Sequence, residues 1–117
     1  MIDQKARELG RLIGQSDEYK ALKRANDGLG QDREAVASLQ RMETLRREAQ
    51  RMLQAGEDPT PEMEQELDGL LSRVQVAPAY QQAIVAQENF DKVMMQVNQW
   101  IAEGIKTGAA SPIITLS

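Results

Sequence analysis

The side chains that could do chemistry in this chain are mainly carboxylates, because its 117 residues include neither cysteine nor histidine. This excludes, for the chain alone, disulfides, thiolate-held zinc or iron–sulfur clusters, and Ser-His or Cys-His nucleophile systems. Acid–base catalysis would fall to carboxylates, lysine or tyrosine. No arrangement of these residues points to a reaction. We therefore expect a non-enzymatic protein with no catalytic residue and no cofactor.

The densest group of carboxylates lies between Glu57 and Asp68. It lacks the alternating Asp/Asn and central Gly of a calcium loop. The Glu62–Glu66 pair has no Glu-x-x-His companion, which makes a di-iron site improbable. We expect no metal site here, and interpret the acids as a solubility feature or a docking surface for a basic protein partner. The candidate partner surface consists of Glu62, Glu64, Glu66 and Asp68.

A run of arginines precedes this group and could contact RNA phosphates. Glu43 and Glu48 interrupt the run, it has no aromatic platform for base stacking, and the net charge is −4. A solvated helix face is the preferred interpretation, and direct nucleic-acid binding is not expected. An RNA-associated factor using this helix remains the alternative, as does a purely structural oligomerising protein. The arginines are Arg41, Arg46, Arg47 and Arg51.

One of these arginines lies inside an apolar stripe. The stem of Arg46 can cover the core while its head reaches water, which is the preferred interpretation. The alternatives are an anchor for a partner, or one half of an interhelical pair.

The elements that must position these residues are helices, because apolar residues recur at helical spacing along the chain. The first helix is predicted over residues 3–14. Ser16 is a predicted N-cap for the second helix, which Asn26 and Gly28 should weaken near its end. Asp32 is the predicted cap of a third helix that continues to Ala55.

Turn residues predict the remaining boundaries. Gly56 should stop the third helix, and Thr60 with Pro61 should begin the fourth. The last helix is predicted over residues 79–106. The fold class is therefore all-α: a bundle of about five helices with two long antiparallel helices, in one domain at 1–106. A tail at 107–117 should leave the bundle, although it is unusually apolar.

The predicted last helix carries more apolar surface than one stripe. Its extra residues lie on two flanks, and such width is typical of burial on two fronts. We therefore expect a homo-oligomer, most simply a dimer with closed symmetry. The alternative is that helices one and four of the same chain cover the extra flank. The candidate interface consists of Ala86, Val93, Trp100 and Met95.

The charged N-terminus is unlike a secretory signal, and no apolar run approaches the length of a membrane span. We expect a cytoplasmic protein.

Two blocks of ordered spacing resemble the YlbF/YmcA family of small bacterial helical proteins. The first consists of Ala6, Leu9, Gly10, Ile13, Ser16, Glu18, Tyr19, Leu22 and Ala25, followed by Asp32. The second consists of Pro78, Ala83, Phe90, Val97, Asn98, Ile101 and Ile105. The blocks span most of the chain, with a variable middle.

The resemblance implies an all-helical fold, self-association, and a regulatory or adaptor role through protein partners. It also implies a link to competence, sporulation and biofilm development, and to a complex acting in ribonuclease-dependent mRNA processing. That complex has been linked to iron–sulfur clusters. This chain differs from the family in that respect, because it has no cysteine and so cannot supply a thiolate ligand to such a cluster.

Overall fold

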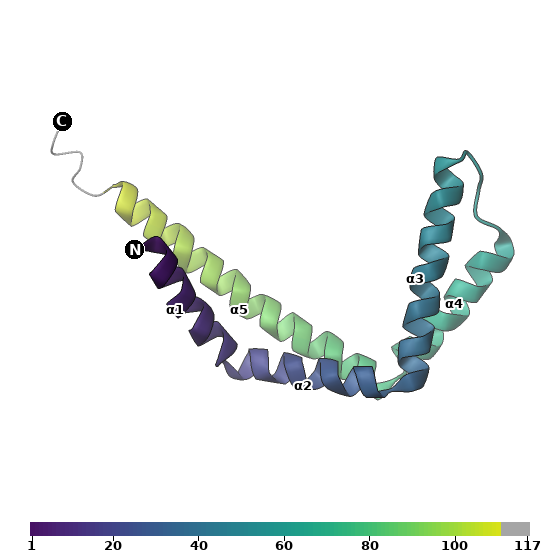
Figure 1. Cartoon of the computed structure of the whole chain (residues 1–117), viewed down its shortest axis with the longest axis horizontal. Helices are drawn as coiled ribbons and strands as arrows, with labels where there is room; N and C mark the ends of the chain where they lie inside the picture. The colour runs from purple at the N-terminus through teal and green to yellow at the C-terminus, as the bar shows by residue number, and fades with distance from the viewer. Residues whose placement is uncertain (111–117) are drawn as a thin grey trace.

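The computed structural model describes residues 1–110, and in this range the chain forms five helices and no strand. In chain order they are α1 (Ile2–Gly14), α2 (Asp17–Gln31), α3 (Arg33–Gln54), α4 (Pro61–Gln75) and α5 (Pro78–Ala109) (Figure 1). The all-α prediction is confirmed.

Local side-chain chemistry begins three of the helices where the sequence predicts. The hydroxyl of Ser16 accepts a hydrogen bond from the Tyr19 N–H at 3.2 Å. The carboxylate of Asp32 accepts one from the Ala35 N–H at 3.1 Å, which begins α3 only one residue after α2 ends. The hydroxyl of Thr60 accepts the Met63 N–H at 3.2 Å, and Pro61 follows it as the first residue of α4. Each cap satisfies a backbone donor that the helix itself leaves free.

Gly56 ends α3 in the left-handed conformation, with φ of 81°. Its N–H donates to the Leu53 carbonyl at 3.1 Å, and the next N–H, of Glu57, donates to the Met52 carbonyl at 2.8 Å. This pair of bonds is a Schellman motif, which glycine adopts without the steric cost that a Cβ would add. The predicted stop is confirmed.

Some boundaries differ from the predicted ones. Helix α2 continues through Gly28 and Gly30 to Gln31, because glycine lowers helix stability by only about 1 kcal/mol and does not break a helix. Helix α5 extends three residues past Lys106, so residues 107–109, the first part of the predicted tail, are helical. The apolar residues Ile113, Ile114 and Leu116 lie outside the described residues.

The helices pack as two antiparallel pairs, α2 with α5 and α3 with α4 (Figure 1). The two longest helices, α3 and α5, lie in different pairs, each beside a shorter neighbour. Buried residues of the α3–α4 hairpin form a cluster of Met42, Leu45, Leu70 and Val74. In the other pair, Tyr19 and Phe90 meet edge to face with ring centroids 5.6 Å apart. The buried residues of this pair are Leu22, Ala83, Ala86 and Val97.

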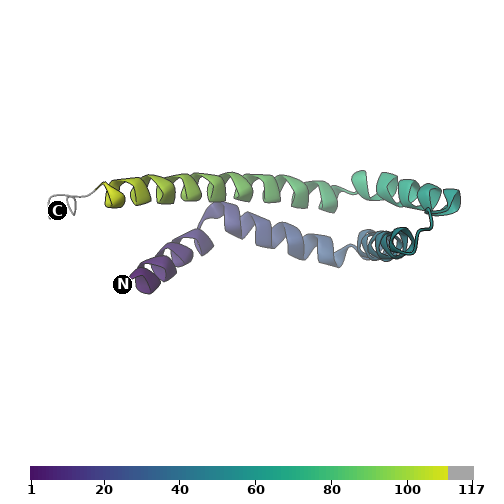
Figure 2. The ribbon, with the colours of Figure 1, turned by 90° about the horizontal axis from the view of Figure 1, so that it is seen from above.

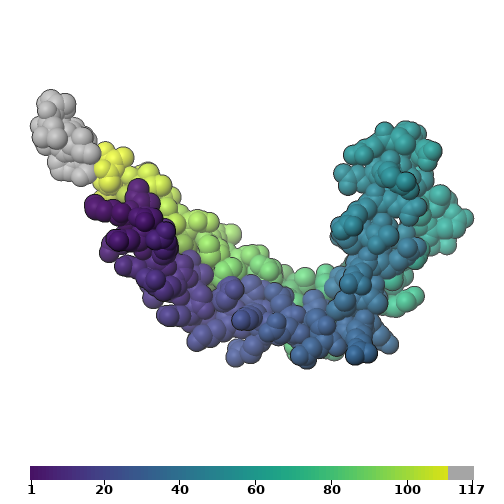
Figure 3. All heavy atoms as spheres, in the orientation of Figure 1, coloured from purple at the N-terminus to yellow at the C-terminus, as the bar shows by residue number. Residues whose placement is uncertain are grey.

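The molecule is elongated, with extents of 68 × 38 × 20 Å. Its radius of gyration is 21.6 Å, against about 13 Å for a compact domain of this length. Figure 3 shows two arms that join at one corner, and Figure 2 shows α1 diverging from α5. The accessible surface is 9248 Å², whereas a compact protein of 13.1 kDa exposes about 6,400 Å². The chain therefore leaves an unusually large surface uncovered.

Candidate functional site

The four residues predicted to form an interface on α5 differ in burial and in the direction in which they point. Trp100 is 59% exposed, and it lines a shallow hollow together with the half-buried Val93. Ala86 is only 7% exposed and is buried within the chain, on the helix that packs against α2. Met95 is 69% exposed, but it is five residues from Trp100 and so lies about 140° away around the helix. The four residues therefore do not form one surface.

The end of the molecule formed by α1 and the C-terminal part of α5 exposes several large apolar side chains. Helix α1 is strongly amphipathic but has no buried residue, and Ile2 is 87% exposed. On α5, Ile101 and Ile105 continue the apolar stripe and are also exposed. Helix α1 packs mainly on α2, and α4 makes only a small contact with α5. Neither α1 nor α4, the helices expected to cover this flank of α5, shields Trp100, which stays largely exposed.

The four predicted acids on α4 are all exposed but lie on two flanks of the helix. Each residue advances the helix by about 100°, so residues two apart point nearly opposite ways and residues four apart share a side. Glu62 and Glu66 therefore lie on one flank, and Glu64 and Asp68 on the other. The four acids, predicted to form one acidic face, instead lie on either side of the apolar face of α4.

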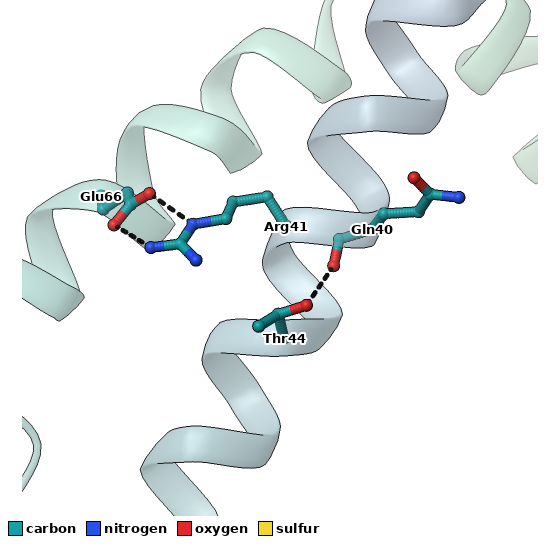
Figure 4. Close-up of polar contacts among 4 residues, drawn as sticks. All are labelled: Gln40, Arg41, Thr44 and Glu66. Carbon is teal, nitrogen blue, oxygen red and sulfur yellow. Dashed lines mark hydrogen bonds and ion pairs between the residues drawn. The ribbon is translucent and has the colours of Figure 1, made fainter.

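The first flank is engaged within the chain. Arg41 on α3 donates from Nε and Nη2 to the two carboxylate oxygens of Glu66, at 2.7 and 3.1 Å (Figure 4). These bonds lower the pKa of Glu66 and, with its negative charge, raise the pKa of Arg41. Such forked pairs are the strong form of an ion pair, because both partners are charged and planar. This pair joins α3 to α4 on one side of the hairpin.

The second flank borders a groove that the sequence reasoning missed. The groove has a volume of about 270 Å³ and lies between the C-terminal half of α3 and the N-terminal half of α4. Leu45, Ala49 and Leu53 line it from α3, and Met63 and Leu67 line it from α4. Arg46 and Glu64 are at its edges. The sequence did contain one indication of this groove. The apolar stripe of α3 continues to Leu53, near the end of a helix that is longer than its partner α4.

The arginines of α3 do not form a continuous basic face. Arg41 pairs with Glu66, Arg47 with Glu43 at 3.2 Å, and Arg51 with Glu48 at 3.9 Å. Arg46 is exposed at the groove and makes no ion pair within residues 1–110. Three of the four positive charges are thus balanced by local carboxylates, which favours the interpretation as a solvated face.

Over residues 1–110, no three acidic side chains gather where they could hold a metal ion. In the same range every buried polar side-chain atom has a hydrogen-bond partner. A further hollow of about 560 Å³ lies at the corner of the molecule and is lined by Asp32, Arg73 and Ala77 among others. None of the helices described is long and apolar enough to cross a membrane.

These features define a small all-helical protein whose distinctive surfaces are apolar or charged helix faces. The family model described as control of competence regulator ComK, YlbF/YmcA, matches residues 2–106. The chain therefore belongs to the YlbF/YmcA family, a family of competence regulators, and the resemblance inferred from spacing is confirmed. Among curated proteins, none matches the chain.

Proposed function

We propose that this chain is a non-enzymatic regulatory adaptor that works by binding other proteins and acts as a homo-oligomer in the cytoplasm. Its membership of a family of competence regulators supports the regulatory part of the proposal. The charged and apolar helix faces support the adaptor part, because such faces are suited to recognising other helices.

The observation that carries the self-association proposal is the uncovered surface. The protomer exposes roughly 2,900 Å² more than a compact protein of its mass would. Obligate homodimers bury about 2,000–5,000 Å² in total, so each protomer contributes about half of that. The excess is therefore large enough to supply an obligate interface.

The best location for this interface is the end where α1 diverges from α5. Ile101 and Ile105 are exposed there on one side of α5, Trp100 is exposed on a neighbouring flank of the same helix, and Ile2 is exposed on α1. A two-fold axis through this end would place these exposed apolar side chains of each copy against those of the other. Tryptophan is a frequent anchor of such interfaces, because its large ring removes much apolar area from water.

The test is sedimentation velocity of the double variant Trp100→Ala with Val93→Ala. We expect the assembly to fall to the monomer while the circular dichroism stays helical, because Trp100 is exposed and Val93 half-buried in the protomer.

The matched control is Leu53→Ala, which truncates a similarly exposed side chain on the other arm. This variant should sediment like the unmodified chain. A folded double variant with unchanged mass would refute the interface, and a control variant that dissociates would place the interface on the hairpin.

A further inference from the structure

The α3–α4 hairpin has two unlike sides. On one side, the forked bond between Arg41 and Glu66 joins the helices. On the other side, Arg46 and Glu64 border the groove and are not within ion-pair distance of any described residue. The hairpin thus has two charges that bind each other on one side, and two charges that make no ion pair with any described residue on the other.

The floor of the groove is apolar and becomes progressively exposed towards the end of α3. Leu45 is 3% exposed, whereas Leu53, two turns further along, is 58% exposed. The stripe that forms the hairpin core therefore continues beyond the part that α4 covers. Pro59, in the connection between the helices, also lines the groove.

We infer that this groove binds an amphipathic helix of a partner protein, with aliphatic side chains on the floor, a basic residue over Glu64 and an acidic residue over Arg46. The inference deepens the adaptor role proposed above and rests on it. Asp68 lies one turn from Glu64 on the same flank of α4, so the acidic edge can accept two basic residues spaced by one turn. The charges at the edges would fix the direction in which the helix lies.

The lining of the groove and its position favour a helix over other occupants. The groove has a volume of about 270 Å³ and runs between two helices with an apolar floor and one charge of each sign, which is the kind of surface that an amphipathic helix recognises. It also lies on the hairpin arm, away from the α1–α5 end (Figures 1 and 3). Self-association at that end would leave the groove accessible.

The test uses a fluorescein-labelled synthetic helix with leucines at i, i+4 and i+7, lysines along one flank and glutamates along the other. Binding to the full chain is followed by fluorescence anisotropy. We expect Leu53→Ser and Glu64→Lys each to weaken binding about tenfold, because each removes a central contact. The Glu64→Lys variant should also bind a second peptide, with glutamates on both flanks, more tightly than the first peptide.

Two matched variants serve as controls. Glu62→Lys makes the same charge change on the opposite flank of α4, and Leu12→Ser removes an exposed leucine from α1. Neither should change the affinity. The inference is overturned if the peptide does not bind at millimolar concentration, or if the control variants weaken it as much as the groove variants do.

Sedimentation of Leu53→Ser separates this inference from the self-association proposal. An unchanged mass is expected, since the groove is not the proposed interface between copies. A mass that falls would instead assign the groove to a second copy of the chain and overturn the inference. Loss of peptide binding with an intact assembly would leave self-association standing.

Discussion

At the residue scale, the contact between Arg41 and Glu66 shows how an exposed ion pair can organise a hairpin. The two residues are 25 apart in sequence, and their forked bond joins helices that otherwise meet through apolar side chains. Isolated surface ion pairs contribute little, but bidentate geometry is the favourable exception. The pair therefore stabilises the hairpin in a way that depends on the charge of Glu66.

This charge dependence predicts a defined response to pH. The pKa of Glu66 is lowered in the folded chain below its ordinary value of 4.5, chiefly by the hydrogen bonds from Arg41. The stabilisation is therefore complete above pH 4.5 and is lost as the pH falls through the lowered pKa. Melting temperatures of the unmodified chain and Glu66→Gln should differ at neutral pH and converge in acid. Glu62→Gln is the control, and a gap that persists in acid would contradict the assignment.

The sequence predicted the acids of α4 as a partner surface but not their arrangement. The division into two flanks follows from helical rotation alone and was accessible from the spacing. The pairing of Glu66 with Arg41 was not, because it depends on the register in which α3 and α4 pack. The same register creates the groove beside Arg46 and Glu64.

At the element scale, the helix ends were the most predictable features. Ser16, Asp32 and Thr60 cap helices, and Gly56 ends one, because capping depends on residues only a few positions apart. The extent of α2 was less predictable, since the helix continues through Gly28 and Gly30 to Gln31 although glycine weakens helices. Local chemistry determines where helices begin, whereas packing influences how far they continue.

Two glycines in the hairpin should respond oppositely to alanine. Gly56 has a positive φ, so Gly56→Ala should lower the free energy of unfolding by about 1 kcal/mol. Gly69 lies within α4 with nothing within 4 Å of an added Cβ, so Gly69→Ala should raise it by about 0.5–1 kcal/mol. Urea denaturation measures both. A stabilising Gly56→Ala would be inconsistent with the Schellman end of α3.

At the scale of the whole molecule, the elongated shape was not predictable from the sequence. An apolar stripe indicates that a helix face is buried but not which helix buries it. The width of the stripe on α5 correctly indicated excess apolar surface, and the structure leaves Trp100 and Ile105 uncovered. Of the predicted interface residues, Ala86 is buried within the chain, and Met95 and Trp100 are exposed on different flanks of α5.

An interface at this end should make stability depend on protein concentration. Association that accompanies folding stabilises the native state by mass action. The melting temperature should therefore rise with concentration, and Trp100→Ala with Val93→Ala should remove this dependence. Differential scanning calorimetry over a range of concentrations measures the effect. A melting temperature independent of concentration in the unmodified chain would contradict obligate self-association.

The corner where the two arms meet has a consequence for how the hairpin can be varied. The chain leaves α2 at Asp32 and returns to α5 at Ala77, and both residues line the same hollow. In topological terms, the hairpin is an insertion whose entry and exit points are neighbours, an arrangement that tolerates replacement of the inserted segment. We therefore expect α1, α2 and α5 to keep their arrangement when the hairpin between Asp32 and Ala77 is lengthened or replaced. Such a change would alter the partner-binding arm without altering the rest of the fold.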